Sequence, residues 1–187
     1  MRFSLISAVA TLGSVMAQPV TRALNAQAMV DGLNQLTTKA QALQAPAKSI
    51  TILNSPLLMI GQGPWPAIIA GYSDIVTTAT TVISQTPGTK PSFGESCDTV
   101  TDSYLTFTST NVETLNILIG KAEILDRVPV IGPPISSVLR HVEGVYDTLV
   151  IFLIDTCESD ATKIQTEADS LGAALDKAIK AYEQLGR

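Results

Sequence analysis

The sequence predicts an all-α protein, a single helical bundle of about five to six antiparallel helices. Apolar residues recur at intervals of three and four in most segments, which is the spacing of one face of a helix. Clusters of Pro and Gly separate these segments. Residues 49–53 are the one place where the alternation typical of a strand competes.

The helical segments follow one another along the chain, and breaks in the pattern delimit them. We expect helices over residues 20–44, 49–60, 66–85, 100–125, 133–156 and 159–185. Proline disfavours the α conformation in the residue before it, so Ala45-Pro46 is expected to end the first helix. The segment TPGTKPSFGES, residues 86–96, predicts a loop. Ser159 is expected to cap the last helix.

The segment over 133–156 begins with a proline pair and becomes apolar on every side near its end. Its polar residues form a narrow stripe over the first turns, and the stripe closes at residues 150–154. A helix that is apolar all round is either the centre of a bundle or a membrane span. The apolar run between Asp147 and Asp155 is far too short to cross a bilayer. We therefore expect this helix to be the central one of the bundle, and no transmembrane anchor.

The N-terminal stretch MRFSLISAVATLGSVMA has the form of a secretion signal. Arg2 gives a minimal basic start, an apolar stretch follows over residues 5–12, and Val15 and Ala17 supply the small residues of a cleavage site. We therefore predict a signal peptide over residues 1–17 and a mature helical-bundle domain over residues 18–187. The protein is expected to be secreted and extracellular.

The chain has two cysteines, Cys97 and Cys157. An even number of cysteines in a secreted protein indicates a disulfide, whereas two free buried thiols are the alternative. Cys97 comes at the start of one expected helix and Cys157 at the end of the next, so both lie at the same end of an antiparallel hairpin. We therefore predict a disulfide bond, and a bridge that closes roughly 60 residues contributes on the order of 4 kcal/mol to stability.

Charge and residue content argue against several functions. The chain has 12 Lys and Arg against 17 Asp and Glu, a balance that disfavours nucleic acid and electrostatic docking on anionic lipid. One histidine and two cysteines cannot form a four-ligand zinc cluster, and no cofactor is expected. The single histidine, His141, lies beside Arg140 on the polar stripe, which favours a surface imidazole over a Ser-His-Asp site. We expect no enzyme activity.

The remaining feature is apolar surface beyond the needs of a small bundle, since the mean hydropathy is +0.28. Helical bundles bind ligands between their helices, where apolar and aromatic side chains line the site. We predict a cavity for a fatty acid or sterol that is lined by Tyr72, Tyr104, Phe107, Leu118, Ile135, Leu139, Val142, Tyr146, Leu149 and Leu153. The alternative is that these side chains simply form the core.

The stretch VPVIGPPISSVLRHVEGVYDTLVIFLIDTC, with the Ala-rich helix that ends LDKAIKAYEQL, resembles the fungal hydrophobic surface binding protein A family. That family includes the cell-wall galactomannoprotein antigens, and the resemblance covers residues 20–185. It implies a secreted, wall-associated helical bundle that adsorbs to hydrophobic surfaces and, as in some members, holds a fatty acid or sterol. The cysteine pair and the Pro-rich corner at 54–66 depart from the simplest members.

Two functions remain open at the level of sequence. The first is a non-catalytic binder of hydrophobic surfaces and apolar ligands. The second is a structural cell-wall antigen or an interaction module that recruits or inhibits a secreted hydrolase, without a lipid cavity. A cavity of several hundred Å³ between helices favours the first function. A close-packed interior with an exposed apolar patch favours the second.

Overall fold

The computed structural model describes residues 25–85, 93–125 and 131–185. The predicted signal peptide and most of the predicted loop at 86–96 lie outside these ranges. The described residues form five α-helices, with short 3-10 helices and no strand between them. The helices are α1 (Ala26–Lys48), α2 (Pro64–Ser84), α3 (Cys97–Ala122), α4 (Gly132–Thr156) and α5 (Ala161–Glu183). The predicted all-α fold and antiparallel succession are confirmed.

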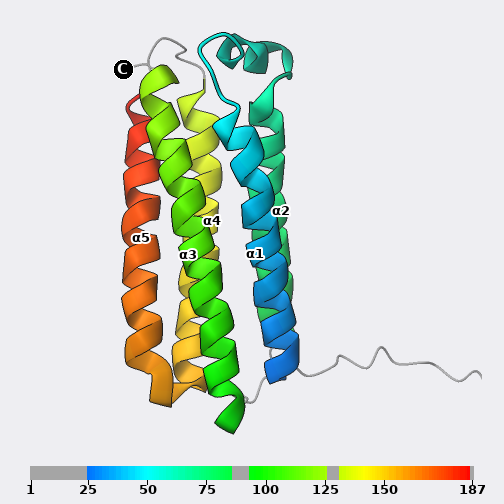
Figure 1. Cartoon of the computed structure of the whole chain (residues 1–187), viewed down its shortest axis with the longest axis vertical. Coiled ribbons are helices and arrows are strands. Elements are labelled where there is room, and N and C mark those ends of the chain that lie inside the picture. The colour runs from blue at the N-terminus through cyan, green and yellow to red at the C-terminus, as the bar shows by residue number, and fades with distance from the viewer. Residues whose placement is uncertain (1–24, 86–92, 126–130, 186–187) are drawn as a thin grey trace, which may run out of the picture.

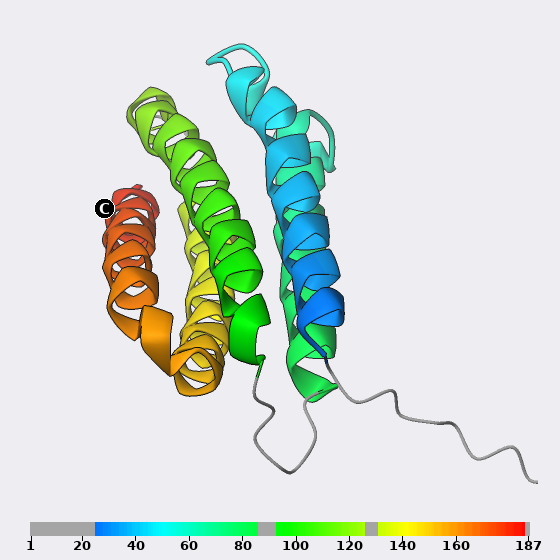
Figure 2. The ribbon, with the colours of Figure 1, turned by 60° about the horizontal axis from the view of Figure 1, so that its bottom comes forward.

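The five helices form two layers (Figure 1). Helices α1, α3 and α5 run in one direction and lie side by side, and α2 and α4 run in the other direction behind them (Figures 1 and 2). The main packing contacts join α1 to α2 and α3, α5 to α3 and α4, and α2 to α4. These contacts make a closed ring, in which α3 faces the α2–α4 pair across the interior. The interior between α3 and that pair is filled by side chains.

The first helix begins and ends differently from its prediction. It begins at Ala26, where the side chain of Asn25 accepts a hydrogen bond from the backbone N–H of Ala28 at 2.8 Å. Pro46 does not end the helix, which continues to Lys48. Proline removes its own N–H donor and crowds the carbonyl four residues earlier. Only two residues of α1 follow Pro46, so the disturbance is confined to the last turn.

Two predictions about other segments were wrong in detail. Ser159 is not the cap of α5, because it lies in a 3-10 turn and Asp160 occupies the cap position. The Asp160 carboxylate accepts a hydrogen bond from the Thr101 hydroxyl at 2.9 Å instead of capping the helix with its side chain. The expected helix over 49–60 is a 3-10 helix over Ser55–Ile60, and residues 49–53 form no strand.

Helix α4 is not the central helix of the bundle. Its main contacts are with α2 and α5, and its outer face meets solvent, where Ile151 is 63% exposed. Val150, Phe152 and Ile154 are only partly buried. In a ring of five helices no helix lies on the central axis. Residues 150–154 are apolar on every side of α4, but this did not mean that every side is buried.

The predicted disulfide is confirmed between Cys97 at the start of α3 and Cys157 at the end of α4. The two Cα atoms lie 5.5 Å apart, within the range of protein disulfides. The bond joins α3 to α4, a pair that otherwise face each other across the interior. It therefore fixes the spacing of these two helices at one end of the bundle.

Candidate functional site

The interior contains every tyrosine of the protein and its single tryptophan. The chain has four tyrosines and one tryptophan, and each of these side chains is no more than 3% exposed. They come from four helices: Trp65 and Tyr72 from α2, Tyr104 from α3, Tyr146 from α4 and Tyr182 from α5. Aromatic residues with a polar group are therefore concentrated in the interior of the bundle, where purely aliphatic side chains would leave no polar group to satisfy.

Ring contacts link α3 to α4 across the interior. The rings of Phe107 and Tyr146 meet edge to face, with centroids 4.9 Å apart and planes inclined by 82°. Tyr104 lies one turn earlier on α3, and its ring centroid is 6.0 Å from that of Phe107. Trp65 and Tyr182 form a separate edge-to-face pair, with centroids 5.9 Å apart. Besides the disulfide, aromatic rings thus bridge α3 and α4 across the interior.

Two of the four tyrosine hydroxyls have hydrogen-bond acceptors. The Tyr146 hydroxyl donates to Asn111 Oδ1 at 2.9 Å, and the Asn111 side chain donates in turn to the Phe107 carbonyl at 2.8 Å. The Tyr182 hydroxyl donates to the Leu118 carbonyl at 2.8 Å. These bonds satisfy the buried polar groups and fix the orientation of both rings.

The other polar aromatic groups have no partner within the described part of the chain. These are the hydroxyls of Tyr72 and Tyr104 and the indole N–H of Trp65, all of them buried. A buried hydroxyl without a hydrogen bond costs roughly 1–3 kcal/mol, and native proteins keep few of them. The hydroxyls of Tyr72 and Tyr104 therefore cost stability, and nothing in the folding of the bundle requires them.

These hydroxyls are held in the protonated, hydrogen-bond-donating form. Burial raises the pKa of Tyr72. Burial is also the largest cause of the raised pKa of Tyr104, and the negative charges of Glu167, Asp147 and Asp169 raise it further. No Asp, Glu, Lys, Arg or His side chain is buried among the described residues. Tyrosine hydroxyls, with the indole of Trp65, are therefore the donors that this interior offers to a polar group of a ligand.

The contrast between paired and unpaired hydroxyls predicts opposite effects of one substitution. Tyr146→Phe leaves the carbonyl of Asn111 buried without its donor, so we expect a loss of about 1–3 kcal/mol of unfolding free energy. Tyr104→Phe removes a hydroxyl that has no acceptor, so we expect unchanged or slightly increased stability. Urea denaturation of the ligand-free variants measures both values. Equal destabilisation by the two substitutions would contradict the assigned hydrogen bonds.

All ten residues of the predicted cavity are buried, each of them no more than 3% exposed. They come from α2, α3 and α4, the three helices that face each other across the interior. The ring and hydrogen-bond contacts bring together Tyr104, Phe107 and Tyr146. Leu118 lies nearer the other end of α3, where its carbonyl accepts from Tyr182.

The prediction missed the polar partners of this interior. Asn111 is not among the ten predicted residues, yet it is buried on α3 and its Oδ1 accepts the hydrogen bond from the Tyr146 hydroxyl. A buried Thr114 donates to the Ala40 carbonyl of α1 at 3.2 Å. The signal that could have revealed these residues is a polar side chain at the spacing of the apolar face, since such a residue must find a partner when buried.

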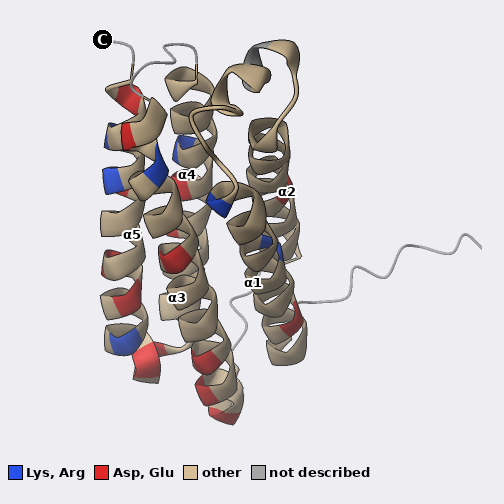
Figure 3. Ribbon diagram, turned by 45° about the horizontal axis from the view of Figure 1, so that its top comes forward, with Lys and Arg blue, Asp and Glu red and all other residues tan. Residues whose placement is uncertain are grey.

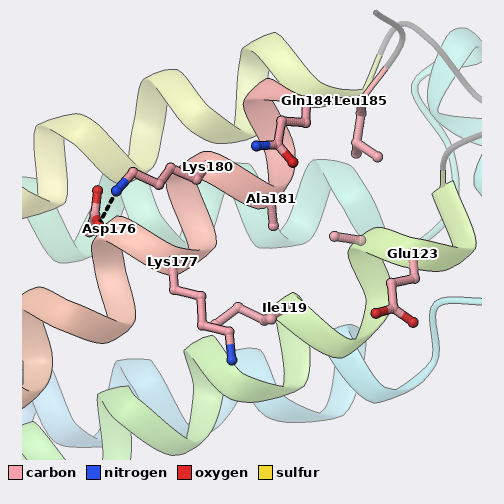
Figure 4. A pocket seen from close by; sticks show the side chains of 9 residues that line it. Ile119, Glu123, Asp176, Lys177, Lys180, Ala181, Gln184 and Leu185 are labelled. Atoms are coloured by element: carbon pink, nitrogen blue, oxygen red, sulfur yellow. Dashed lines mark hydrogen bonds and ion pairs between the residues drawn. The ribbon is translucent and has the colours of Figure 1, made fainter.

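Two grooves on the described surface border α5. The larger, with a volume of about 730 Å³, lies between α3 and α5, with Ile119, Ala181 and Leu185 beside the charged side chains of Lys177 and Glu123 (Figure 4). Asp176 and Lys180 form an ion pair at its rim (Figure 4). The groove does not involve any of the ten predicted residues, and it opens onto solvent.

The second groove lies between α4 and α5 and has a volume of about 510 Å³. Its lining includes Tyr146, Leu171 and Leu175, which are buried, and Gly172, where an added Cβ would meet open space. Tyr146 is also the ring that contacts Phe107. The smaller groove therefore shares one residue, Tyr146, with the predicted site, and the larger one shares none.

Groups that would indicate catalysis or a metal do not assemble in the described residues. His141 is exposed on α4. No set of three His, Cys, Asp or Glu side chains lies close enough together to hold a metal ion in the described ranges. Helix α2 alone among the described helices has the length and hydropathy of a membrane span, but it packs its apolar face, with Trp65, Ile68 and Ile75, into the bundle.

No protein-family model and no curated protein matches the chain. The fold is similar to ligand-binding domain 2 of the Penicillium marneffei MP1 protein, solved with multiple arachidonic acids, at a TM-score of 0.71 and 12% identity over 86% of this chain and 97% of that one. It is also similar to AfMP4P, solved in complex with palmitic acid, at a TM-score of 0.73 and 18% identity over 84% of this chain and 99% of that one.

Ligand-binding domain 1 of the same MP1 protein, complexed with arachidonic acids, matches at a TM-score of 0.62 and 15% identity over 82% of this chain and 98% of that one. At such identities the likeness shows the fold alone. The fold is thus that of fungal helical ligand-binding domains. This agrees in part with the family resemblance of the sequence, because membership of the hydrophobic surface binding protein A family is not shown.

Proposed function

We propose that the protein is a secreted, non-catalytic fatty-acid-binding protein that holds an acyl chain between α3 and the α2–α4 pair. Three observations support the proposal. The N-terminal sequence has the form of a secretion signal. The solved proteins that share the fold carry arachidonic or palmitic acid. The interior contains hydrogen-bond donors that the protein itself leaves unpaired.

The unpaired hydroxyls of Tyr72 and Tyr104 carry the proposal. A fatty acid has one polar end, and its carboxyl oxygens accept hydrogen bonds from neutral donors such as these. The bond would recover the free energy that each buried hydroxyl loses in the ligand-free protein. No buried cation competes for this role in the described residues, so the tyrosine hydroxyls set the position of the carboxyl group.

The acyl chain would lie against the apolar side chains of the predicted site, including Val142, Leu149 and Leu153 on α4. Each methylene group removed from water contributes about 0.8 kcal/mol before the costs of binding are subtracted. Side chains fill the interface of α3 with α2 and α4, so the proposal requires this interface to open when the chain enters. Helix α3 makes its main packing contacts with α1 and α5 and not with α2 or α4, which is why we place the opening here. We place the entry route at the α4–α5 groove, because Tyr146 is among its lining residues.

A titration with palmitic acid below its micelle concentration tests the proposal. We expect wild-type protein to bind at micromolar concentration or better, and Val142→Phe to lower the affinity at least about tenfold, because the added ring fills the space of the chain. Val145→Phe is the matched control: it is the same substitution on α4 at a half-buried position outside the predicted site. We expect the control to bind within about twofold of wild type.

Circular dichroism of both variants confirms that the helices are retained, so that a lost affinity reports the site. The proposal fails if wild-type protein binds no palmitic acid, or if both variants bind as tightly as wild type. A cholesterol-type sterol in the same titration tests the second ligand class that the sequence predicts. Adsorption to hydrophobic surfaces and association with the cell wall belong to the same proposal. A hydrolase partner would need a surface site of its own.

A further inference from the structure

The corner between α1 and α2, residues 49–63, presents large apolar side chains to solvent. The exposed large hydrophobic residues of the described chain are five, and four lie in this corner: Ile52 at 64%, Leu53 at 90%, Leu57 at 37% and Ile60 at 67%. The fifth is Ile151 on α4. Such a concentration is uncommon on a protein surface and marks a site of interaction. We call these four residues the apolar corner.

The corner is an ordered part of the fold, not a loose loop. The Asn54 side chain accepts from the Thr51 backbone N–H at 2.8 Å and donates to the Ser49 carbonyl at 2.7 Å. The buried Ser55 hydroxyl donates to the Thr51 carbonyl at 2.6 Å. Ile50 is fully buried, and its carbonyl accepts from Lys121 Nζ of α3 at 2.9 Å. These bonds hold the backbone so that Ile52 and Leu53 remain outside.

The corner also lies at the end of the bundle, beyond the helices that it joins (Figure 1). No Asp or Glu occurs between Asp31 and Asp74, although the chain has 17 such residues. Figure 3 shows acidic residues on the helices and none on the corner. Lys48 ends α1 beside the corner, and Lys121 Nζ donates to the Ile50 carbonyl within it. Because the corner has no carboxylate, it can move out of water without the cost of removing a negative charge from water.

We infer that the apolar corner inserts into the interface of a lipid bilayer. The corner lies at one end of the molecule and its four apolar side chains face solvent, so a fluid surface that deforms around it fits better than a rigid partner. Lys48, which is exposed at the end of α1, can extend its charged end to the headgroup level. Because the protein as a whole is negatively charged, insertion depends on the apolar side chains and not on anionic lipid. The inference rests on the proposed function, since fatty acids partition into bilayers.

Co-sedimentation with phosphatidylcholine vesicles tests the inference. We expect wild-type protein to partition onto these vesicles, and the double variant Ile52→Asp with Leu53→Asp to lose at least about tenfold of the partition coefficient. Ile151→Asp is the matched control, because it removes an equally exposed isoleucine from the side of the bundle. It should bind vesicles as wild type does. Raised salt should change wild-type binding little, because the interaction is apolar.

Palmitic acid titration of the double variant in the absence of vesicles separates this inference from the proposed function. The inference predicts an unchanged affinity for free palmitic acid together with lost vesicle binding. Equal vesicle binding by wild type and double variant overturns it, as does wild-type binding only to anionic vesicles at low salt. Sedimentation velocity tests the alternative that the corner binds a second copy of the chain. That alternative would hold if wild-type protein is a dimer that binds no vesicles and the double variant is a monomer.

Discussion

Raising the pH from about 9 to about 11 is expected to lower the free energy of unfolding by about 5 kcal/mol. The reason is the burial of all four tyrosines, since burial raises the pKa of Tyr72, Tyr104, Tyr146 and Tyr182 above the ordinary value near 10. A group whose pKa is raised in the folded state adds stability below its unfolded pKa and loses it as the pH rises further. Each tyrosine then lowers the free energy of unfolding by about 1.4 kcal/mol for each pH unit above 10.

Urea denaturation at several pH values, with phenolate absorbance as a second probe, measures this effect. We expect phenolate absorbance to appear only as the helical signal is lost. Tyr104→Phe should reduce the loss between about pH 9 and about pH 11 by roughly a quarter, because one of four buried phenols is removed. Complete phenolate formation near pH 10 in protein that keeps its native helical signal would contradict the burial of the tyrosines.

Removing the disulfide is expected to cost on the order of 4 kcal/mol. The bond between Cys97 and Cys157 spans a sequence separation of 60 residues, and a loop of that length restricts the unfolded chain strongly. The loss should be accompanied by a weaker association of α3 with α4 at the bridged end. Among small domains, whose total stability is about 5–15 kcal/mol, such a change brings the protein close to its unfolding threshold.

Denaturant titration of the Cys97→Ala, Cys157→Ala double variant measures this loss. Wild-type protein in reductant is the matched comparison, because it lacks the bond but keeps both sulfur atoms. The two should agree within about 1–2 kcal/mol, the added cost of the alanine variant being the small cavities that it leaves. A loss below about 1 kcal/mol in both would show that the bond does not restrict the unfolded chain as the loop length predicts.

The periodicity of the sequence determined the helices well because each is long and amphipathic. The apolar residues that recur at intervals of three and four are buried on both α2 and α3: Ile68, Tyr72 and Ile75 on α2, and Val100, Leu115 and Leu118 on α3. Helix ends were less predictable, since they depend on single hydrogen bonds. Pro46 inside α1 and Asp160 in place of Ser159 illustrate this, because neither choice affects the apolar face.

The position of each helix in the bundle could not be predicted from its composition. The apolar run near the end of α4 suggested burial on all sides, yet Ile151 faces solvent. The order of the five helices around the bundle decides which helices pack together, and the sequence pattern of each helix does not specify that order. The disulfide is the exception, because hairpin topology alone placed Cys97 and Cys157 at one end.

The candidate site was predictable in its apolar part and not in its polar part. Large hydrophobic side chains on facing helices identified the walls of the interior. The pairing of Tyr146 with Asn111, and the absence of an acceptor for Tyr72 and Tyr104 in the described residues, depend on side-chain geometry. This difference matters for the proposed function, because the proposal uses the unpaired hydroxyls to position the carboxyl group of the ligand.

The central claim is that an acyl chain binds in the interior between α3 and the α2–α4 pair. Isotope-filtered nuclear Overhauser measurements with ¹³C-labelled palmitic acid test it most directly, because they report which side chains touch the ligand. We predict contacts from the acyl chain to the rings of Tyr72, Tyr104 and Phe107. Contacts confined to Ile119 and Leu185 in the α3–α5 groove, or none from the bound ligand to any interior ring, would contradict it.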